Sequence, residues 1–321
     1  MLRRLAALTL TATLALLGAA VPAQAAMVAC RHVASGPRCL VWTGTVSWVA
    51  DGDTPRVDLD GDGTRELVSI RLVGIQAMEQ SVYSPQPAKR RGDCHALQAT
   101  ARFEQLVKAG GGKIRITALQ ASSSSGRRPL RSVAVRIDDQ WHDVGLDLVR
   151  RGLALWLPFS GEWAWDEQYR KATQQAAADR VGLFDTDFCG SGPSQDSGIR
   201  MTVNGDPDGV DADNLNGEYF RIVNPSSRAV PVGGWWVRDS ALRRYTIPPG
   251  NVVPAGGEFV VHVGRGTNTA THKYWGLSQP IFTNVDPANH GYGDGGYLFD
   301  PQGDLRAWDV YPCVVACQGK S

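Results

Sequence analysis

A change in the pattern of the chain near residue 190 most constrains what it can fold into. Segments with helical periodicity occur before this point, whereas the chain after it holds short strand-like runs between Gly, Pro, Asn and Asp. The boundary, Cys-Gly-Ser-Gly-Pro-Ser-Gln-Asp-Ser-Gly at 189–198, has the composition of a linker. At 321 residues the chain is also longer than one ordinary small domain. We therefore expect two domains, residues 26–190 and 199–321, joined by a linker over 191–198.

The first 25 residues have the three parts of a secretory signal peptide. Arg3 and Arg4 give a basic start, residues 5–17 are mostly apolar, and Ala23-Gln24-Ala25 is a small-x-small cleavage site. The apolar run is shorter than the roughly 20 residues that a membrane-spanning helix needs. We predict a signal peptide over 1–25, cleavage after Ala25, and a secreted, extracellular protein.

Six cysteines follow the predicted cleavage site, and an even number in an exported chain indicates disulfides. Six cysteines allow fifteen connectivities, so sequence alone leaves the pairing open. The pairing that keeps each bridge inside one domain is Cys30–Cys39, Cys94–Cys189 and Cys313–Cys317.

The predicted first domain is of the α+β class. We expect strands over 44–50, 56–59, 66–74, 113–119 and 132–137, and helices over 95–108, 144–151 and 167–180. Five strands with helices packed on them fit the partly open OB-fold-type barrel that binds oligonucleotides. In the second domain, strands over 219–223, 235–238, 245–247, 258–263 and 297–299 are typical of an all-β, immunoglobulin-like sandwich.

The charges of the whole chain nearly cancel. The 33 Lys and Arg against 32 Asp and Glu give a net charge of +1. Residues 26–190 hold 21 basic and 19 acidic residues, and residues 191–321 hold 10 and 13. This balance argues against binding nucleic acid through bulk positive charge, but it permits a binder that concentrates its cations at one site.

Three clusters in the first domain carry residues suited to phosphodiester hydrolysis: Asp51-Gly52-Asp53-Thr54, Arg71 to Glu79, and Arg131 with the apolar strand after it. Together they would supply a carboxylate for a hard cation, a carboxylate base and two guanidinium groups. A metal polarises the phosphoryl oxygen, a base activates water, and arginines neutralise the charge of the transition state. His95 and His142 lack triad partners, and we expect both at the surface.

The order of these clusters resembles the thermonuclease family of staphylococcal-nuclease-like domains. The resemblance rests on GTVSWVADGDTPRV (44–57), IRLVGIQAMEQ (70–80), RSVAV (131–135), DLVRRGLALW (147–156) and DEQYRKATQQAAADRVGLF (166–184). It implies calcium-dependent hydrolysis of DNA and RNA phosphodiesters with little sequence preference, leaving a 3′-phosphate.

The resemblance also implies individual roles. Asp53 would be a calcium ligand, together with Gln76 and Ala77. Glu79 would activate water, and Arg71 and Arg131 would hold the phosphate.

The chain departs from the family pattern at several positions. Gln76, Ala77 and Met78 stand where the family has Asp, a small residue and Pro, and the lost carboxylate predicts weaker calcium binding. Arg127 and Arg128 compete with Arg131 for the role of second phosphate clamp. Trp156 and Phe159 are positioned either to stack on a base or to join the core.

The second domain resembles the lamin-tail family of immunoglobulin-like sandwiches, through segments 217–239, 245–269 and 295–309. This resemblance implies a tethering or interaction role with a partner that the sequence does not identify. The leading hypothesis is thus a secreted calcium-dependent nuclease. The alternative is a catalytically impaired protein that binds nucleic acid or a surface, and it is motivated by Gln76 and Met78.

Overall fold

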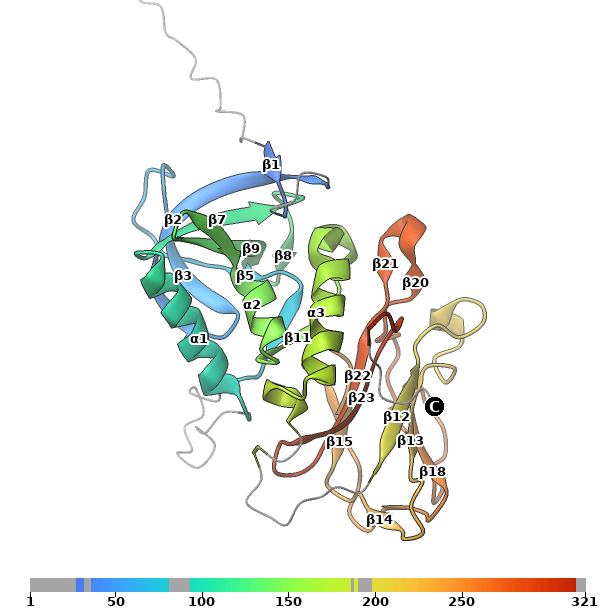
Figure 1. The fold of residues 1–321 in the computed structure, drawn as a ribbon. Helices are drawn as coiled ribbons and strands as arrows, with labels where there is room; N and C mark the ends of the chain where they lie inside the picture. The colour runs from blue at the N-terminus through green and yellow to red at the C-terminus, as the bar shows by residue number, and fades with distance from the viewer. Residues whose placement is uncertain (1–26, 32–35, 81–92, 186–187, 190–197, 316–321) are drawn as a thin grey trace, which may run out of the picture.

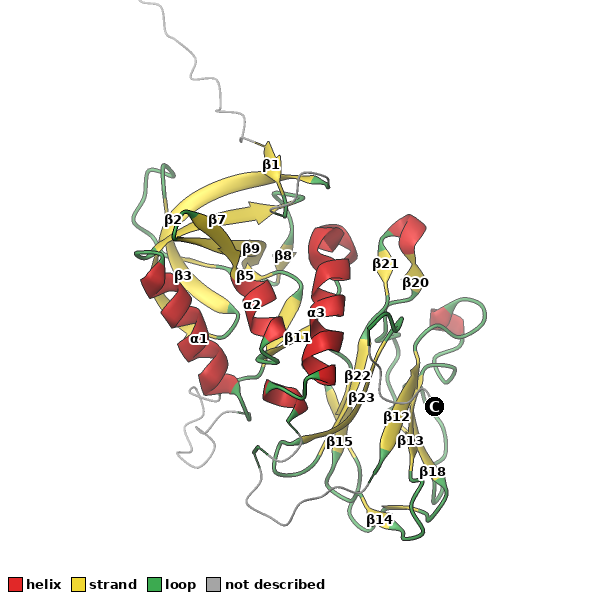
Figure 2. Ribbon diagram, viewed as in Figure 1, coloured by secondary structure: helices red, strands yellow, loops and turns green. Residues whose placement is uncertain are grey.

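The computed structural model describes residues 27–31, 36–80, 93–185, 188–189 and 198–315 (Figure 1). The protein is mostly β-structure with few helices (Figure 2). We call the described residues up to 189 the N-terminal part and those from 198 the C-terminal part. The predicted signal peptide and most of the predicted linker lie outside the described residues. Within them, no helix is long and apolar enough to cross a membrane.

A curved sheet of the half-barrel kind forms the N-terminal part. Its main path runs β10-β9-β7-β2-β3-β4, with β1, β5 and β8 paired onto β2 or β9. The strands are β1 (Met27–Ala29), β2 (Arg38–Asp51), β3 (Thr54–Leu59), β4 (Val68–Ser69), β5 (Arg71–Leu72), β7 (Lys113–Ala118), β8 (Ser124–Ser125), β9 (Arg128–Ile137) and β10 (Gln140–Asp143). Two register shifts between β2 and β3 coincide with its curvature, since bulges bend and twist a strand.

The segment that we expected as one strand over 66–74 is divided in the structure. β4 pairs with β3, whereas β5 pairs in parallel with β9. Gly74 then has a φ of 77°, and a Cβ there would lie 2.9 Å from the ring of Tyr169, so the turn requires glycine. After this turn, β6 (Ile75–Ala77) pairs with β11 (Ala154–Trp156). The division brings the Arg71 to Glu79 cluster next to the Asp53 turn.

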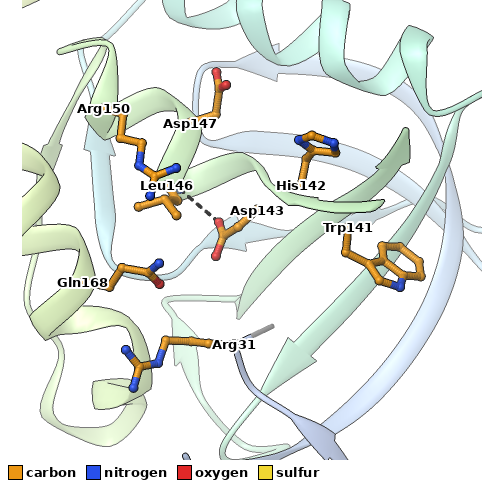
Figure 3. A pocket seen from close by; sticks show the side chains of 8 residues that line it. All are labelled: Arg31, Trp141, His142, Asp143, Leu146, Asp147, Arg150 and Gln168. Atoms are coloured by element: carbon orange, nitrogen blue, oxygen red, sulfur yellow. Dashed lines mark hydrogen bonds between the residues drawn. The ribbon is translucent and has the colours of Figure 1, made fainter. Parts of the chain in front are cut away.

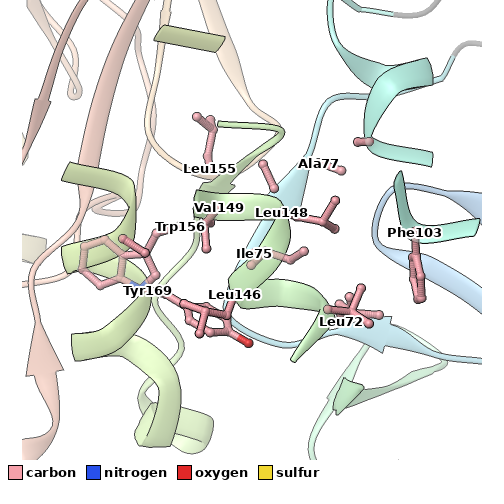
Figure 4. Close-up of a cluster of buried hydrophobic side chains, with 14 of the residues drawn as sticks. Leu72, Ile75, Ala77, Phe103, Leu146, Leu148, Val149, Leu155, Trp156 and Tyr169 are labelled. Atoms are coloured by element: carbon pink, nitrogen blue, oxygen red, sulfur yellow. The ribbon is translucent and has the colours of Figure 1, made fainter. Parts of the chain in front are cut away.

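Three α-helices pack on this sheet close to their predicted positions: α1 (Ala96–Ala109), α2 (Val144–Arg150) and α3 (Asp166–Ala178). Asp143 caps α2 by accepting a hydrogen bond of 3.0 Å from the backbone N–H of Leu146. Helix and strand side chains meet in the core that Figure 4 shows, which includes Ile75, Phe103 and Trp156. Two short 3₁₀ helices, η2 (Ser160–Trp165) and η3 (Gly182–Phe184), flank α3.

The C-terminal part is a sandwich of two four-stranded sheets. One sheet runs β12-β13-β18-β19 and the other β16-β15-β22-β23. The strands are β12 (Arg200–Asn204), β13 (Tyr219–Val223), β15 (Trp236–Arg238), β16 (Arg244–Thr246), β18 (Glu258–His262), β19 (His272–Tyr274), β22 (Gly295–Phe299) and β23 (Leu305–Val310). Short pairs complete it: β14 (Val230–Pro231) with β17 (Val252–Val253), and β20 (Val285–Asp286) with β21 (Gly291–Tyr292). All five predicted strands are present, and no α-helix occurs among residues 198–315.

The two parts pack against each other through α3 and β23 (Figure 1). The rings of Phe184 and Trp308 meet edge to face at 5.1 Å, and both belong to one buried cluster. Gln174 is 1% exposed, and its Nε2 donates to the carbonyl of Val310 at 2.8 Å. Its Oε1 accepts from the N–H of Val314 at 3.0 Å. The C-terminal part is therefore docked through apolar contacts and through the hydrogen bonds of Gln174.

Two of the predicted disulfides are confirmed. Cys30 is bonded to Cys39, and Cys94 to Cys189. Cys317, the predicted partner of Cys313, lies outside the described residues. Two disulfides are typical of proteins in an oxidising, extracellular environment.

Candidate active site

A cleft of about 520 Å³ lies where the N-terminal and C-terminal parts meet. Arg71, Gln76 and Arg128 line its N-terminal side, together with the side chain of Phe159. The other wall comes from the C-terminal part and consists of Asp239, Ala241, Leu242, Arg243, Pro280 and Ile281. The volume is within the range of small-molecule and cofactor sites.

An ion pair between Asp53 and Arg71 is the centre of the site. Arg71 Nη1 lies 2.8 Å from Asp53 Oδ2, and both side chains are buried. The same carboxylate oxygen accepts a hydrogen bond of 2.9 Å from the N–H of Ala77. These contacts join the turn after β2 to strands β5 and β6, so the first two of the three sequence clusters meet.

Gln76 extends this network toward the protein surface. Its Oε1 accepts from Arg71 Nη2 at 2.6 Å, and its Nε2 donates to Glu79 Oε1 at 3.1 Å. Glu79 itself is exposed. A continuous chain of polar contacts thus runs from buried Asp53 through Arg71 and Gln76 to a carboxylate in contact with solvent.

The environment raises the pKa of both carboxylates. Burial raises the pKa of Asp53 to about 7; Arg71 opposes this shift and Asp51 adds to it. Partial burial and then the charge of Asp51 raise the pKa of Glu79 as well. A raised pKa makes Glu79 a stronger base than an ordinary surface glutamate.

The predicted calcium ligands are hard oxygen donors: the carboxylate of Asp53, the amide oxygen of Gln76 and the carbonyl oxygen of Ala77. Each oxygen already accepts a hydrogen bond, since Gln76 Nε2 donates to the carbonyl of Ala77 at 2.9 Å. Each also has lone-pair capacity left. The chemistry of this set fits a divalent cation, but only one ligand is charged and Arg71 competes for it.

No cluster of three carboxylates reinforces this set in the described part of the chain. The group of His, Cys, Asp or Glu ligand atoms found within 4.8 Å of one another there is Cys94, His95 and Cys189. Its two cysteines form a disulfide. His95 is 5% exposed and stacks on Phe188, so our expectation that it lies at the surface was wrong.

The structure does not bring Arg131 to the cleft. Its Nη1 donates to the carbonyl oxygens of Ser123 and Leu130 at 3.0 and 2.7 Å, and its guanidinium lies over the ring of Trp42. Arg128 instead lines the cleft and donates to Thr54 Oγ1 at 3.2 Å. Of the three competing arginines, Arg128 therefore lines the cleft, while Arg127 is exposed outside the cleft lining.

Of the two aromatic candidates, one also lies in the core and the other at the cleft. Trp156 is fully buried, and its Nε1 donates to Asp166 Oδ1 at 3.0 Å, so it belongs to the core. Phe159 is 40% exposed and lines the cleft. The sequence did not predict the wall supplied by residues 239–243. The spacing of motifs within one domain does not indicate where that domain contacts a second domain.

A second, smaller hollow of about 190 Å³ lies over α2 (Figure 3). Its acidic side chains already have structural partners. Asp143 caps α2 and accepts from Tyr169 at 2.7 Å, and Asp147 pairs with Arg102 at 2.6 Å. These partners leave the larger cleft as the better candidate for chemistry.

Comparison with known families assigns the C-terminal part. Residues 199–312 match the family model of the Lamin Tail Domain, which has an immunoglobulin-like fold. No curated protein matches the chain. The family match leaves the N-terminal part unassigned, so the function of that part rests on its residues and geometry.

Proposed function

We propose that the protein is a secreted, calcium-dependent nuclease that hydrolyses phosphodiester bonds of DNA and RNA with little sequence preference, using an OB-type barrel of the staphylococcal-nuclease kind. The observation that carries the proposal is the network Asp53–Arg71–Gln76–Glu79, of which Arg71 and Gln76 line the cleft. Two further cleft features suit a nucleotide: the second cation of Arg128 and the exposed ring of Phe159.

In this proposal the two arginines bind the phosphate and Glu79 activates water. Arg71 and Arg128 hold the non-bridging oxygens and neutralise charge that grows in the transition state. Glu79 accepts a proton from water as the water oxygen bonds to phosphorus. The bond from phosphorus to the 5′ oxygen breaks, and that oxygen takes up a proton from solvent. The products are a 3′-phosphate and a 5′-hydroxyl.

Asp53, Gln76 and Ala77 are the residues that would hold calcium, which would polarise a phosphate oxygen as a Lewis acid. A single carboxylate, already paired with Arg71, predicts weak binding, because ligand charge sets calcium affinity. Activity should therefore rise through the millimolar range of calcium (on the order of 10⁻⁴–10⁻³ M or above).

The direct test incubates residues 26–321, produced with disulfides formed, with plasmid, single-stranded DNA and RNA. We expect cleavage of all three in calcium and none in excess chelator. Absence of cleavage at every calcium concentration would contradict the proposal.

Gln76 supports a second candidate, a catalytically impaired protein that binds nucleic acid or a surface. In this case Arg71 holds Asp53 permanently and no working metal site forms. Gln76→Asp adds the missing carboxylate, and the impaired-site account predicts that the variant gains cleavage at least about tenfold over wild type. Rates measured across a calcium series decide between the two, since strong wild-type cleavage with no gain from Gln76→Asp rejects impairment.

A further inference from the structure

One wall of the cleft belongs to the lamin tail domain, for which the sequence alone predicts only a tethering or interaction role. Residues 239–243 follow β15, and Pro280 and Ile281 lie in the loop before β20. They face the same space as Arg71, Gln76 and Arg128. Whatever enters the candidate site must therefore also meet the lamin tail domain.

Hydrogen bonds hold the 239–243 segment in place. Asp239 Oδ1 accepts from the N–H of Ala241 at 2.9 Å. Arg238 is 3% exposed and donates to the carbonyl oxygens of Asp239 and Ser240 at 3.1 and 2.9 Å. The segment is thus anchored at its base by a buried arginine.

The neighbouring loop is anchored by a buried carboxylate. The two oxygens of Glu218, which is fully buried, accept from the N–H groups of Ile281 and Phe282 at 2.9 and 3.2 Å. Because the whole domain is also docked on α3, this wall has a fixed position relative to Arg71 and Arg128.

The wall exposes one cation and one apolar side chain. Arg243 is exposed and makes no hydrogen bond or ion pair to any residue in the described ranges. Leu242 is 53% exposed, and Phe159 in the same cleft is 40% exposed. A guanidinium beside apolar surface offers contacts to a phosphate and to the face of a base.

The charge of the whole cleft lining favours an anion, although residues 191–321 carry more acidic than basic residues. Arg71, Arg128 and Arg243 line the cleft, whereas Arg238 and Arg244 do not. Asp239 is the acid in the lining; its carboxylate accepts from the N–H of Ala241, and burial raises its pKa while the nearby charges of Arg238 and Arg243 oppose this rise. Three arginines and one acid therefore line the cleft.

We propose that residues 239–243 of the lamin tail domain form a nucleotide-binding subsite of the nuclease, in which Arg243 binds a phosphate next to the one being cleaved and Leu242 contacts its base. This inference rests on the function proposed above. The subsite lengthens the site beyond the one phosphodiester held by Arg71 and Arg128. It makes the enzyme favour polynucleotides over single nucleotides.

Arg243→Gln tests the subsite, with Arg228→Gln as the matched control, because Arg228 is exposed in the same domain but does not line the cleft. The substrates are a single-stranded DNA 12-mer and a nitrophenyl ester of a mononucleotide. We expect Arg243→Gln to raise KM for the 12-mer about five- to tenfold, the range of one lost phosphate contact. Cleavage of the ester should stay within about twofold of wild type. For the 12-mer, the slope of log KM against the logarithm of the salt concentration should also decrease by about 0.7 in Arg243→Gln.

The subsite would be overturned if Arg243→Gln and Arg228→Gln had the same kinetics on both substrates. It would also be overturned if Arg243→Gln lost as much activity on the ester as on the 12-mer. Binding of a fluorescent 12-mer in chelator, measured by anisotropy, separates this failure from failure of the proposed nuclease. If wild type binds without cleaving, and Arg243→Gln weakens binding while Arg228→Gln does not, the subsite holds and the enzyme activity is rejected. If wild type neither binds nor cleaves, both proposals are wrong.

Discussion

At the scale of single residues, two arginines three positions apart on β9 have opposite environments. Arg128 is half-buried beside Thr54 at the cleft, whereas Arg131 is 8% exposed and donates to main-chain carbonyl oxygens. Successive side chains of a strand point to opposite faces, so positions 128 and 131 cannot share one. The sequence motif at 131–135 predicted the strand correctly, but it could not identify which arginine faces the cleft.

This difference predicts separate effects for two matched variants. Arg128→Gln should lower the cleavage rate by about tenfold or more and leave stability unchanged, because it removes a cation from the cleft. Arg131→Gln should lower the free energy of unfolding by roughly 1–3 kcal/mol, because buried carbonyl oxygens lose charged donors. Urea unfolding and DNA cleavage measure the two effects. If Arg131→Gln is as stable as wild type but does not cleave DNA, the structural role of Arg131 is wrong.

Asp166, the first residue of α3, predicts a pH dependence of stability. Burial raises its pKa to about 7 from an ordinary value of 3.8, against the hydrogen bond from Trp156. Between these pH values the folded protein binds a proton that the unfolded chain releases, so Asp166 makes stability fall as pH rises from about 4 to 7. Asp166→Asn should reduce this fall by the order of 1–3 kcal/mol.

Unfolding in urea at several pH values measures the effect, with exposed Asp138→Asn as the control. The fall should be reduced but still present in Asp166→Asn, because burial also raises the pKa of Asp53 and Glu218 to about 7. A pH profile unchanged from wild type would show that Asp166 titrates normally.

At the scale of elements, the sequence pattern predicted the helices and strands that depend on residues close together in the chain. Local sequence patterns located α1, α2, α3 and β7, and alternation over 132–137 located the later part of β9. The division of 66–74 into β4 and β5 was not predictable, because pairing with β3 on one side and β9 on the other is a long-range contact. The same is true of β11, whose partner β6 lies nearly eighty residues earlier in the chain. For the site, motif order predicted the meeting of Asp53, Arg71, Gln76 and Glu79.

At the scale of the whole molecule, the docked lamin tail domain adds an arginine to the cleft of a chain whose charges nearly cancel. The small surplus of residues 26–190 cannot hold a polynucleotide by bulk attraction. Arg71 and Arg128 of the N-terminal part and Arg243 of the lamin tail domain instead line one cleft. Binding is thus expected to depend on the relative position of the two parts, which the contacts of α3 with β23 maintain.

The central claim is that Glu79, which is hydrogen-bonded to the cleft residue Gln76, activates water, and the cleavage rate of Glu79→Gln in saturating calcium tests it most directly. Glu104→Gln is the control, since Glu104 is an exposed acid on α1. We predict that Glu79→Gln lowers kcat on single-stranded DNA by about 10²–10⁴-fold, the contribution of a general base, while Glu104→Gln cleaves like wild type. Cleavage by Glu79→Gln at the wild-type rate would contradict the claim.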